Sequence, residues 1–357
     1  GLKTIGVTGT NGKSTTTALI GHILNDAGMR VAVGGNIGKA ALDLDLSGVD
    51  AVVLELSSYQ LDLCPDFAPD IAVHLNLTPD HLDRHGDVEG YKAAKMRIFR
   101  GTGQAVIGVD DAPSQAMIQS VKESGARAVY AISSSAPVAR GVYVRDGVLF
   151  DAMGAQPAEI GDLRAMKTLP GVHNHQNAAA AYAVCRLMET RAEAIMAAMR
   201  RYPGLPHRMH LVRVINGVSY VNDSKATNAD AAAKALACYR NIYWILGGKP
   251  KDGGLDGLEP LLERVSHAFV IGAAAPDFSR WLARRGVPLT QCDTMARAVP
   301  EAHRLAQAGR GQPGGAGVVM LSPACASFDQ FRSFEHRGDV FTDLVKALPE
   351  GQEGAGK

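Results

Sequence analysis

The sequence predicts an α/β protein in which a P-loop domain with a mostly parallel sheet precedes a second, Rossmann-like α/β domain. Three observations lead to this fold class. Short apolar runs of strand length alternate with helical stretches along most of the chain. The first of these runs enters a glycine-rich turn that opens a helix. A length of 357 residues accommodates about two domains of roughly 150 residues each.

In the first half, the apolar runs and helical spacings predict elements in alternating order, which implies a parallel sheet covered on both faces. A further segment, residues 141–150, carries Asp146-Gly147 between two apolar stretches, a strong hairpin signal that predicts a small antiparallel insert. The expected strands are Lys3–Thr8, Arg30–Val33, Asp50–Leu56, Asp70–Leu75 and Gln104–Val109, and the expected helices are Ser14–Ala27 and Val88–Phe99.

The second unit is expected to begin near Tyr202–Pro206, where two prolines and a glycine in five residues form an inter-domain joint. Asn216-Gly217 predicts another hairpin. We therefore expect domains at residues 1–204 and 205–348, followed by a flexible tail at 349–357. The strands expected in this unit are Leu211–Ile215, Val218–Asn222, Ile242–Leu246, Ala268–Ile271 and Val318–Leu321.

Composition narrows the function classes. Lys and Arg number 37 and Asp and Glu number 36, a net charge of +1, which argues against a protein that binds nucleic acid electrostatically. No apolar run approaches the roughly 20 residues of a membrane helix, and the first residues resemble a strand rather than a signal segment. The five cysteines form no Cys-x-x-Cys pair. We expect a cytoplasmic monomer without nucleic-acid or membrane partners.

The sharpest motif is Gly6-Val-Thr-Gly9-Thr-Asn-Gly12-Lys13-Ser14-Thr15 between the first strand and its helix. Backbone amides of such a loop and the helix N-terminus bind phosphate, a lysine reaches the outer phosphates, and a Ser or Thr hydroxyl ligates Mg²⁺. Val7 stands where the usual pattern has its first glycine. The alternative interpretation is a glycine-rich turn that caps a helix.

Two further segments carry groups that suit a metal. Glu55 ends an apolar run, and a buried strand seldom ends in a charge without a reason. His81 lies in a loop with Asp80, Asp83 and His85, where metal ligation and a solvated loop both remain open. Lys95, taken alone, fits a solvated helical lysine.

The second half holds several polar segments at expected strand ends. Asn174 fits a helix N-cap, and Arg208 at the domain junction suits a phosphate. Polar segments after three strands suggest a substrate cleft, because open α/β sheets bind ligands at the carboxyl ends of their strands. These segments are Asn222–Asn228, Gly247–Lys251 and Ser322–Phe331.

Together these segments resemble the Mur ligases, in order and from about Lys3 to Leu348. The motifs that carry the resemblance to the family are Gly9–Thr15, Gly34–Gly38, Glu55–Ser58, Asp80–Arg84 and Ala93–Lys95. Asn222–Asn228 and Ser322–Phe331 resemble the branch that adds D-glutamate. The family also carries an N-terminal domain that binds uridine diphosphate. Because the P-loop strand begins here at Lys3, we expect this chain to lack it.

The resemblance implies an ATP-dependent ligase that joins D-glutamate to UDP-N-acetylmuramoyl-L-alanine through an acyl phosphate, in peptidoglycan precursor synthesis. It implies ATP and two Mg²⁺ ions as cofactors, and a carbamylated Lys95. Three alternatives stay open: a sibling ligase for another amino acid, such as a folylpolyglutamate synthetase; a P-loop NTPase without ligase activity; and a catalytically silent binding fragment.

The resemblance also assigns individual residues. Phe328 stands where a family relative is expected to have Leu, next to the implied glutamate pocket. The implied catalytic residues are Lys13, Glu55, His81 and Lys95, of which Glu55, His81 and Lys95 hold metal together with Ser14. Those implied for ATP are Gly9, Thr10, Asn11, Gly12, Lys13, Ser14, Thr15, Asn36, Asn174, Asn177, Arg208 and Asp223. Those implied for the other substrates are Ser57, Lys225, Thr227, Lys251, Ser327 and Phe334.

Overall fold

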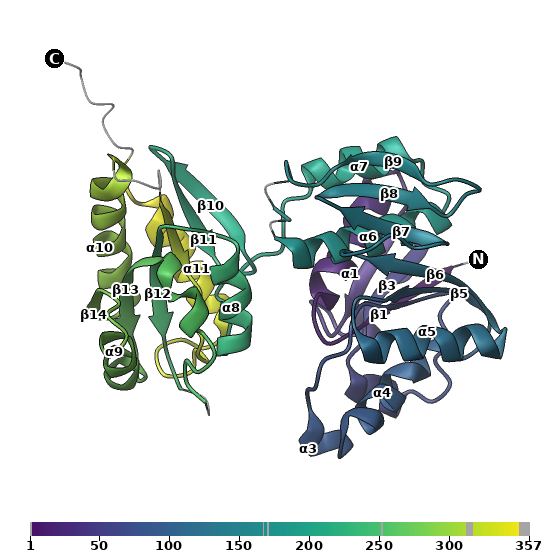
Figure 1. The fold of residues 1–357 in the computed structure, drawn as a ribbon, viewed down its shortest axis with the longest axis horizontal. Coiled ribbons are helices and arrows are strands. Elements are labelled where there is room, and N and C mark those ends of the chain that lie inside the picture. Colours follow the sequence, from purple (N-terminus) through teal and green to yellow (C-terminus); the bar gives the residue numbers. More distant parts are fainter. Residues whose placement is uncertain (1, 167, 170, 251–252, 312–316, 350–357) are drawn as a thin grey trace. The chain divides into compact units, whose positions relative to one another are not determined.

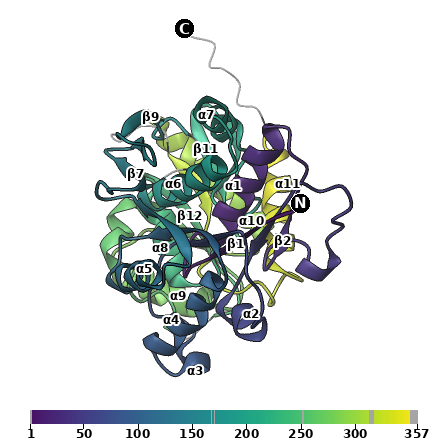
Figure 2. The ribbon, with the colours of Figure 1, turned by 90° about the vertical axis from the view of Figure 1, so that its right-hand side faces the viewer.

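The computed structural model describes residues 2–166, 168–169, 171–250, 253–311 and 317–349, and the chain forms two compact units. Unit 1 is Gly1–Pro203 and unit 2 is Gly204–Lys357. Both are sheets covered by helices (Figures 1 and 2). The Lys251 position and the tail from residue 350 lie outside the described residues.

Unit 1 is built on a nine-stranded sheet in the order β2-β3-β1-β4-β5-β6-β7-β8-β9. The neighbouring pairs from β2 to β7 are parallel, and β7, β8 and β9 pair antiparallel. The strands are β1 (Lys3–Thr8), β2 (Val31–Gly35), β3 (Ala51–Glu55), β4 (Ile71–His74), β5 (Gly103–Gly108), β6 (Arg127–Ser133), β7 (Gly141–Arg145), β8 (Val148–Ala152) and β9 (Ala158–Asp162).

Side chains alternate between the two faces of this sheet, as a pleated strand requires. Val73 and Val106 pack into the apolar cluster that contains α1, α6 and α7, whereas Ala72 and Ala105 pack into the cluster that contains α4 and α5. The helices of unit 1 are α1 (Lys13–Asp26), α2 (Ser58–Leu63), α3 (Leu82–His85), α4 (Val88–Met96), α5 (Ala112–Ser124), α6 (Val172–Leu187) and α7 (Ala192–Arg201), with short 3₁₀ turns at η1 (Ala41–Asp43) and η2 (Arg97–Phe99).

Unit 2 holds a six-stranded sheet in the order β10-β11-β15-β12-β13-β14, parallel except for the antiparallel β10–β11 pair. Trp244 and Leu246 pack on the face with α8 and α9, and Ile245 packs on the face with α10 and α11. The elements are β10 (His210–Ile215), β11 (Val218–Asn222), α8 (Ala229–Ala237), β12 (Ile242–Gly247), η3 (Glu259–Arg264), β13 (Val265–Ile271), α9 (Ala275–Ala283), β14 (Leu289–Asp293), α10 (Met295–Ala308), η4 (Gly309–Gly311), β15 (Val318–Leu321) and α11 (Phe334–Lys346).

The predicted fold class is confirmed, and the differences are local. The predicted hairpin forms, but β7 and β8 extend the main sheet instead of forming a separate insert. The expected helix Val88–Phe99 is divided, because its last three residues tighten into η2. Two elements were not predicted, namely α5, which is rich in polar and small residues, and β6, which has an alternating pattern.

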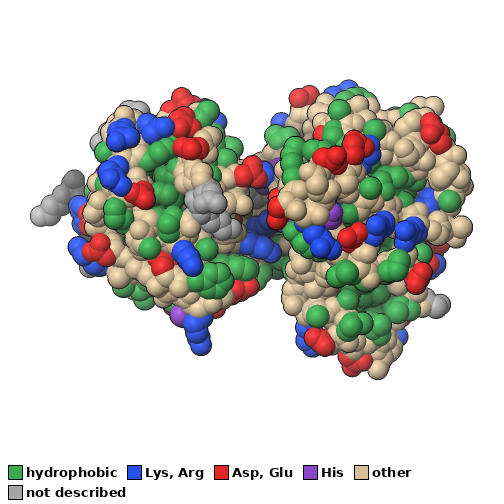
Figure 3. Space-filling model, turned by 90° about the horizontal axis from the view of Figure 1, so that it is seen from below, with side chains coloured by type: hydrophobic (Ala, Val, Ile, Leu, Met, Phe, Trp, Pro, Cys, Tyr) green, Lys and Arg blue, Asp and Glu red, His purple; other side chains and the backbone are tan. Residues whose placement is uncertain are grey.

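Acidic and basic side chains are interspersed over the face drawn in Figure 3. Among the residues that the structure describes, no helix combines the length and apolar character needed to span a bilayer.

Candidate functional site

The candidate site of unit 1 lies where adjacent parallel strands end at one edge of the sheet. In the register of β1 and β3, Val7 is opposite Glu55, and in that of β1 and β4, Thr8 is opposite His74. Asn36 follows β2 directly, and its backbone N–H donates to the Glu55 carbonyl at 2.9 Å. The strand order therefore brings residues that are tens of positions apart in the sequence to one edge of the sheet.

The loop from Gly9 to Gly12, here called the glycine-rich loop, has a path that only glycine permits at its last residue. Gly12 is left-handed, with φ of 85°, and a Cβ there would lie 2.1 Å from the Asn177 Oδ1. Gly12 is also the N-cap of α1 and supplies no capping side chain. The N–H groups of a helix N-terminus without such a cap suit an anion.

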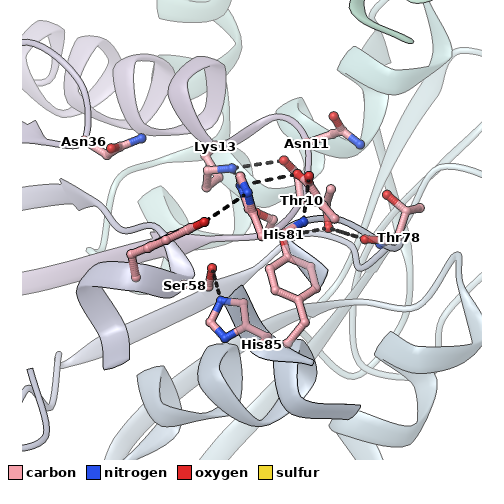
Figure 4. Close-up of polar contacts among 12 residues, drawn as sticks. Thr10, Asn11, Lys13, Asn36, Ser58, Thr78, His81 and His85 are labelled. Atoms are coloured by element: carbon pink, nitrogen blue, oxygen red, sulfur yellow. Dashed lines mark hydrogen bonds and ion pairs between the residues drawn. The ribbon is translucent and has the colours of Figure 1, made fainter. Parts of the chain in front are cut away.

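Lys13, the first residue of α1, folds back over this loop. Its ammonium donates to the carbonyls of Gly9 and Thr10, both at 3.0 Å. Figure 4 shows Lys13 reaching back toward the loop and Thr10. Ser14 and Thr15 follow it and are buried in the first turn of the helix. The predicted phosphate-binding residues thus lie together around one short turn.

Lys95 is a buried amine beside the same loop. It is 1% exposed, and its Nζ donates to the Gly9 carbonyl at 2.8 Å and to Thr8 Oγ1 at 3.4 Å. The Tyr91 ring lies under it, 4.6 Å from centroid to Nζ. Burial, reinforced by the charge of Lys13, holds the pKa of Lys95 well below its ordinary value. Lys95 is therefore a buried amine whose charged form is disfavoured, rather than a solvated lysine.

Glu55 is a buried carboxylate with an unused acceptor. Its Oε1 accepts from Asn36 Nδ2 at 3.1 Å, whereas its buried Oε2 has no hydrogen-bond partner among the described residues. Such an oxygen is expensive to bury unless something binds it. An oxygen ligand at this place fits a hard cation such as Mg²⁺.

His81 lies at an exposed turn, where it is the N-cap of α3. It adopts a left-handed φ of 52°, and its ring lies 3.5 Å from Asp80 Oδ2 and from the Tyr59 hydroxyl. Its neighbour His85 bonds Ser58 Oγ at 3.0 Å through Nε2 (Figure 4). No group of three or more His, Cys, Asp or Glu side chains in the described ranges is arranged to hold a metal.

Ser57 has a structural role in this chain. Its side chain caps α2 by accepting from the Gln60 N–H at 3.2 Å, and Gln60 Oε1 accepts from the Ser57 N–H at 2.9 Å. This reciprocal pair is a capping box. A role for Ser57 in substrate binding stays a prediction.

Helix α6 brings Asn177 to Gly12 and the first turn of α1, with Asn174 hydrogen-bonded to it. Asn177 Oδ1 accepts from Thr16 Oγ1 at 3.3 Å, and Asn177 Nδ2 donates to Asn174 Oδ1 at 3.0 Å. The prediction that Asn174 caps this helix was wrong. The N-cap is Gly171, and Asn174 is buried within the first turn, where it orients Asn177.

In unit 2, Asp223 follows β11 and is buried. Its Oδ2 accepts from Ser322 Oγ at 2.9 Å and its Oδ1 from the Met209 N–H at 3.1 Å. Burial raises the pKa of Asp223 to about 7, although both hydrogen bonds and the charge of Arg208 oppose the shift. The carboxylate therefore titrates near neutral pH.

Four further predicted residues of unit 2 lie on the loops after β11 and β15 and at the start of α11; they are Lys225, Thr227, Ser327 and Phe334. Lys225 Nζ lies 5.8 Å from the centroid of the Phe334 ring, and the Thr227 N–H donates to the Lys225 carbonyl at 2.9 Å. Ser327 is buried, whereas Phe328 beside it is 69% exposed. Lys251, the fifth residue predicted for D-glutamate in this unit, lies outside the described residues.

Sequence reasoning missed Arg337, a fully buried cation on α11. Its guanidinium donates to Ser224 Oγ and to the backbone carbonyls of Ser224 and Cys325 at 2.8–3.1 Å. Burial lowers the pKa of Arg337 to about 10. Because these carbonyls belong to the two predicted glutamate loops, Arg337 joins them. The apolar spacing of α11 could have placed Arg337 inward, but not its partners.

Comparison with known proteins covers both units. The sequence model of one protein family, described as the Mur ligase middle domain, matches residues 7–185. UDP-N-acetylmuramoylalanine–D-glutamate ligase of Rhodospirillum rubrum is 54% identical over 355 residues, which are 98% of this chain and 74% of the relative. The enzyme of that name from Phenylobacterium zucineum is 48% identical, over 99% of this chain and 75% of the relative.

Solved structures show the same fold at low identity. MurF from Acinetobacter baumannii is 21% identical with a TM-score of 0.69, over 97% of this chain and 77% of that one. MurF ligase from Thermotoga maritima, solved in complex with ADP, is 20% identical with a TM-score of 0.61, over 97% of this chain and 81% of that one. At these identities the likeness concerns the fold alone.

Proposed function

Since the chain belongs to the Mur ligase family, we propose that it is an ATP-dependent ligase that joins D-glutamate to UDP-N-acetylmuramoylalanine. The observation that carries this proposal is the match to D-glutamate ligases at 48–54% identity over nearly all of the chain. The match includes unit 2, to which the predicted glutamate residues belong. The product amide belongs to peptidoglycan precursor synthesis.

The chemistry requires activation of a carboxylate that is unreactive toward amines. Transfer of the γ-phosphoryl group of ATP to the alanine carboxylate forms an acyl phosphate and releases ADP. The D-glutamate amine then attacks the acyl carbon, the new C–N bond forms, and phosphate leaves with the electron pair of the broken C–O bond while the amine loses a proton. Positioning and electrostatic stabilisation supply most of the catalysis in such transfers.

The glycine-rich loop and Lys13 hold the phosphates in this proposal. The N-terminus of α1 attracts the anion, and Lys13 moves from the Gly9 and Thr10 carbonyls to the outer phosphates. Asn177 and its neighbour Asn174 approach the same turn from α6 and contribute amides on the nucleotide side. Asn36 stands at the end of β2 and orients Glu55.

Glu55 and Lys95 suit Mg²⁺ in different ways. The partnerless Oε2 of Glu55 is an available carboxylate oxygen, and the hydroxyls of Ser14 or Thr15 lie at the start of α1. Lys95 has the depressed pKa that reaction with CO₂ requires, and its carbamate offers oxygen in place of nitrogen. His81 completes the proposed set. These residues would hold Mg²⁺, which would supply positive charge beside the transferring phosphoryl group.

The predicted residues of unit 2 are proposed to bind ATP and D-glutamate. Asp223 and Arg208 serve ATP in this proposal, the carboxylate as an acceptor for hydroxyl groups and the guanidinium for phosphate. Lys225, Thr227, Lys251, Ser327 and Phe334 are proposed for D-glutamate, whose two carboxylates call for cations and hydroxyl donors.

The test is phosphate release from ATP by the purified chain, measured with all substrates and with each one omitted. Release that needs both UDP-N-acetylmuramoylalanine and D-glutamate supports the proposal. L-Glutamate, other amino acids and a folate-type acceptor are the matched controls. Selective release with another pair would favour a sibling ligase, and release indifferent to amino acid would favour an NTPase.

A further inference from the structure

A line of polar side chains connects the surface of unit 1 to the glycine-rich loop. It starts at three successive serines at the end of β6, Ser133 to Ser135, passes through Asp110 and Gln176, and ends at Asn76 beside the loop. These residues come from four separate segments of the chain, and none of them except the loop itself belongs to the site described above.

The outer end of this line is a carboxylate that can only accept. Asp110 Oδ1 accepts from the hydroxyls of Ser133 at 2.5 Å and Ser135 at 2.9 Å. Its Oδ2 accepts from the N–H and hydroxyl of Ser134 and from Gln176 Nε2 at 2.9 Å. These hydrogen bonds outweigh desolvation and keep the pKa of Asp110 below its ordinary value. The acceptor therefore stays charged and fixed.

Because Asp110 cannot donate, it sets the direction of every amide after it. Gln176 must turn its NH₂ toward Asp110, so its Oε1 faces Asn76 Nδ2 and accepts from it at 2.8 Å. Asn76 must then turn its Oδ1 toward the loop, where it accepts from the Asn11 N–H at 2.8 Å. Each amide has one orientation that satisfies both neighbours.

The inner end of the line shapes the glycine-rich loop. Asn76 Nδ2 also contacts the Asn11 carbonyl at 3.3 Å, and the Asn76 carbonyl accepts from the Thr10 N–H at 2.9 Å. The side chain and backbone of Asn76 thus bind both middle residues of the loop. Gln176 is buried, and a Cβ on Gly108 would lie 3.2 Å from its Nε2, so the passage is narrow.

We propose that Gln176 is a positioning residue for ATP, which transmits the fixed orientation of the Asp110 carboxylate through Asn76 to the glycine-rich loop. In this proposal Gln176 acts through Asn76 and not on the phosphates. It holds the Asn11 N–H toward Asn76 and so sets the path of the loop before the nucleotide arrives. This inference rests on the proposed function of the loop as the ATP site.

The test compares two glutamine variants of the whole chain by calorimetric titration with MgATP. Gln176→Met has a side chain of similar length but makes neither hydrogen bond of the glutamine amide. It should raise the Kd for MgATP about tenfold, because two part-buried hydrogen bonds are lost and Asn76 loses one acceptor. Gln115→Met is the matched control. Its amide donates to the Val109 carbonyl at 2.9 Å, next to Asp110, but does not reach the loop.

A structural readout separates positioning from general destabilisation. In Gln176→Met, hydrogen exchange at the backbone of residues 9–12 should be faster, while α7 and β8 keep wild-type protection. Asp110→Asn should weaken MgATP binding in the wild-type background and have little further effect in Gln176→Met, since both act through one line.

A Kd for MgATP in Gln176→Met within twofold of the wild-type value would overturn the inference. So would an equal loss of affinity in Gln176→Met and Gln115→Met, or additive losses in the double variant of Asp110→Asn and Gln176→Met. Absence of MgATP binding by the wild-type chain would instead overturn the proposed function. The two failures are thereby distinguished.

Discussion

Asp223→Asn should make unit 2 more stable at neutral pH. The Asp223 carboxyl has an ordinary pKa of 3.8 and a pKa of about 7 in the folded chain, chiefly because it is buried. The asparagine side chain has the same shape. Its oxygen accepts from the Met209 N–H, and its NH₂ donates to Ser322 Oγ, so both existing partners are kept.

The sign follows from proton uptake. Between pH 3.8 and about 7 the folded state holds a proton that the unfolded state has released, so the free energy of unfolding falls as pH rises. The contribution is complete below the unfolded pKa and is lost as pH passes the folded one. A shift of about three pKa units at 1.36 kcal/mol each corresponds to about 4 kcal/mol.

Urea unfolding followed by tryptophan fluorescence measures this in unit 2 alone, because both tryptophans of the chain, Trp244 and Trp281, lie there. The variant and wild type should have equal unfolding free energies near pH 4 and differ by up to about 4 kcal/mol near pH 8, in favour of the variant. A difference that stays constant across pH would refute the reasoning. The stabilised variant should nevertheless bind MgATP more weakly, since a carboxylate proposed for ATP is gone.

Three other changes test unit 1. Lys13→Ala should lower ATP-dependent turnover by a factor on the order of 10² to 10³ without loss of fold, as measured by phosphate release and circular dichroism. Lys95→Ala should abolish turnover and the CO₂ adduct that native mass spectrometry detects, whereas Lys92→Ala, on the same helix but paired with Glu89 at the surface, should change neither. Gly12→Ala should lower stability by about 2 kcal/mol or more, measured by calorimetry, because φ is left-handed and the Cβ meets an amide oxygen.

Much of the fold was predictable because its signals are local. Apolar runs, the Asp146-Gly147 and Asn216-Gly217 turns and the glycine-rich loop each specify structure within about ten residues. The order of strands in the sheet is not local, and neither is the pairing of Glu55 with Asn36. Both depend on which strands become neighbours in the sheet. A single sequence indicates this only through its resemblance to a known family.

Side chains whose roles depend on distant partners were harder to predict. The spacing of residues 172–187 shows a helix, and Asn174 near its start looked like a cap, yet Gly171 holds that position and Asn174 turns inward to Asn177. Gln176 carried no signal at all, because an amide becomes informative only when its neighbours are known. Arg337 is similar, since its partners are backbone carbonyls that any sequence provides.

Two lysines beside the glycine-rich loop show how local and distant effects combine. Lys13 and Lys95 both donate to the Gly9 carbonyl, at 3.0 and 2.8 Å, and two ammonium groups sharing one acceptor repel each other. Burial distinguishes them, because Lys95 is almost fully enclosed and Lys13 is only partly buried. Burial therefore lowers the pKa of Lys95, and the charge of Lys13 lowers it further. Phosphate binding and the proposed reaction of Lys95 with CO₂ are therefore linked through one carbonyl oxygen.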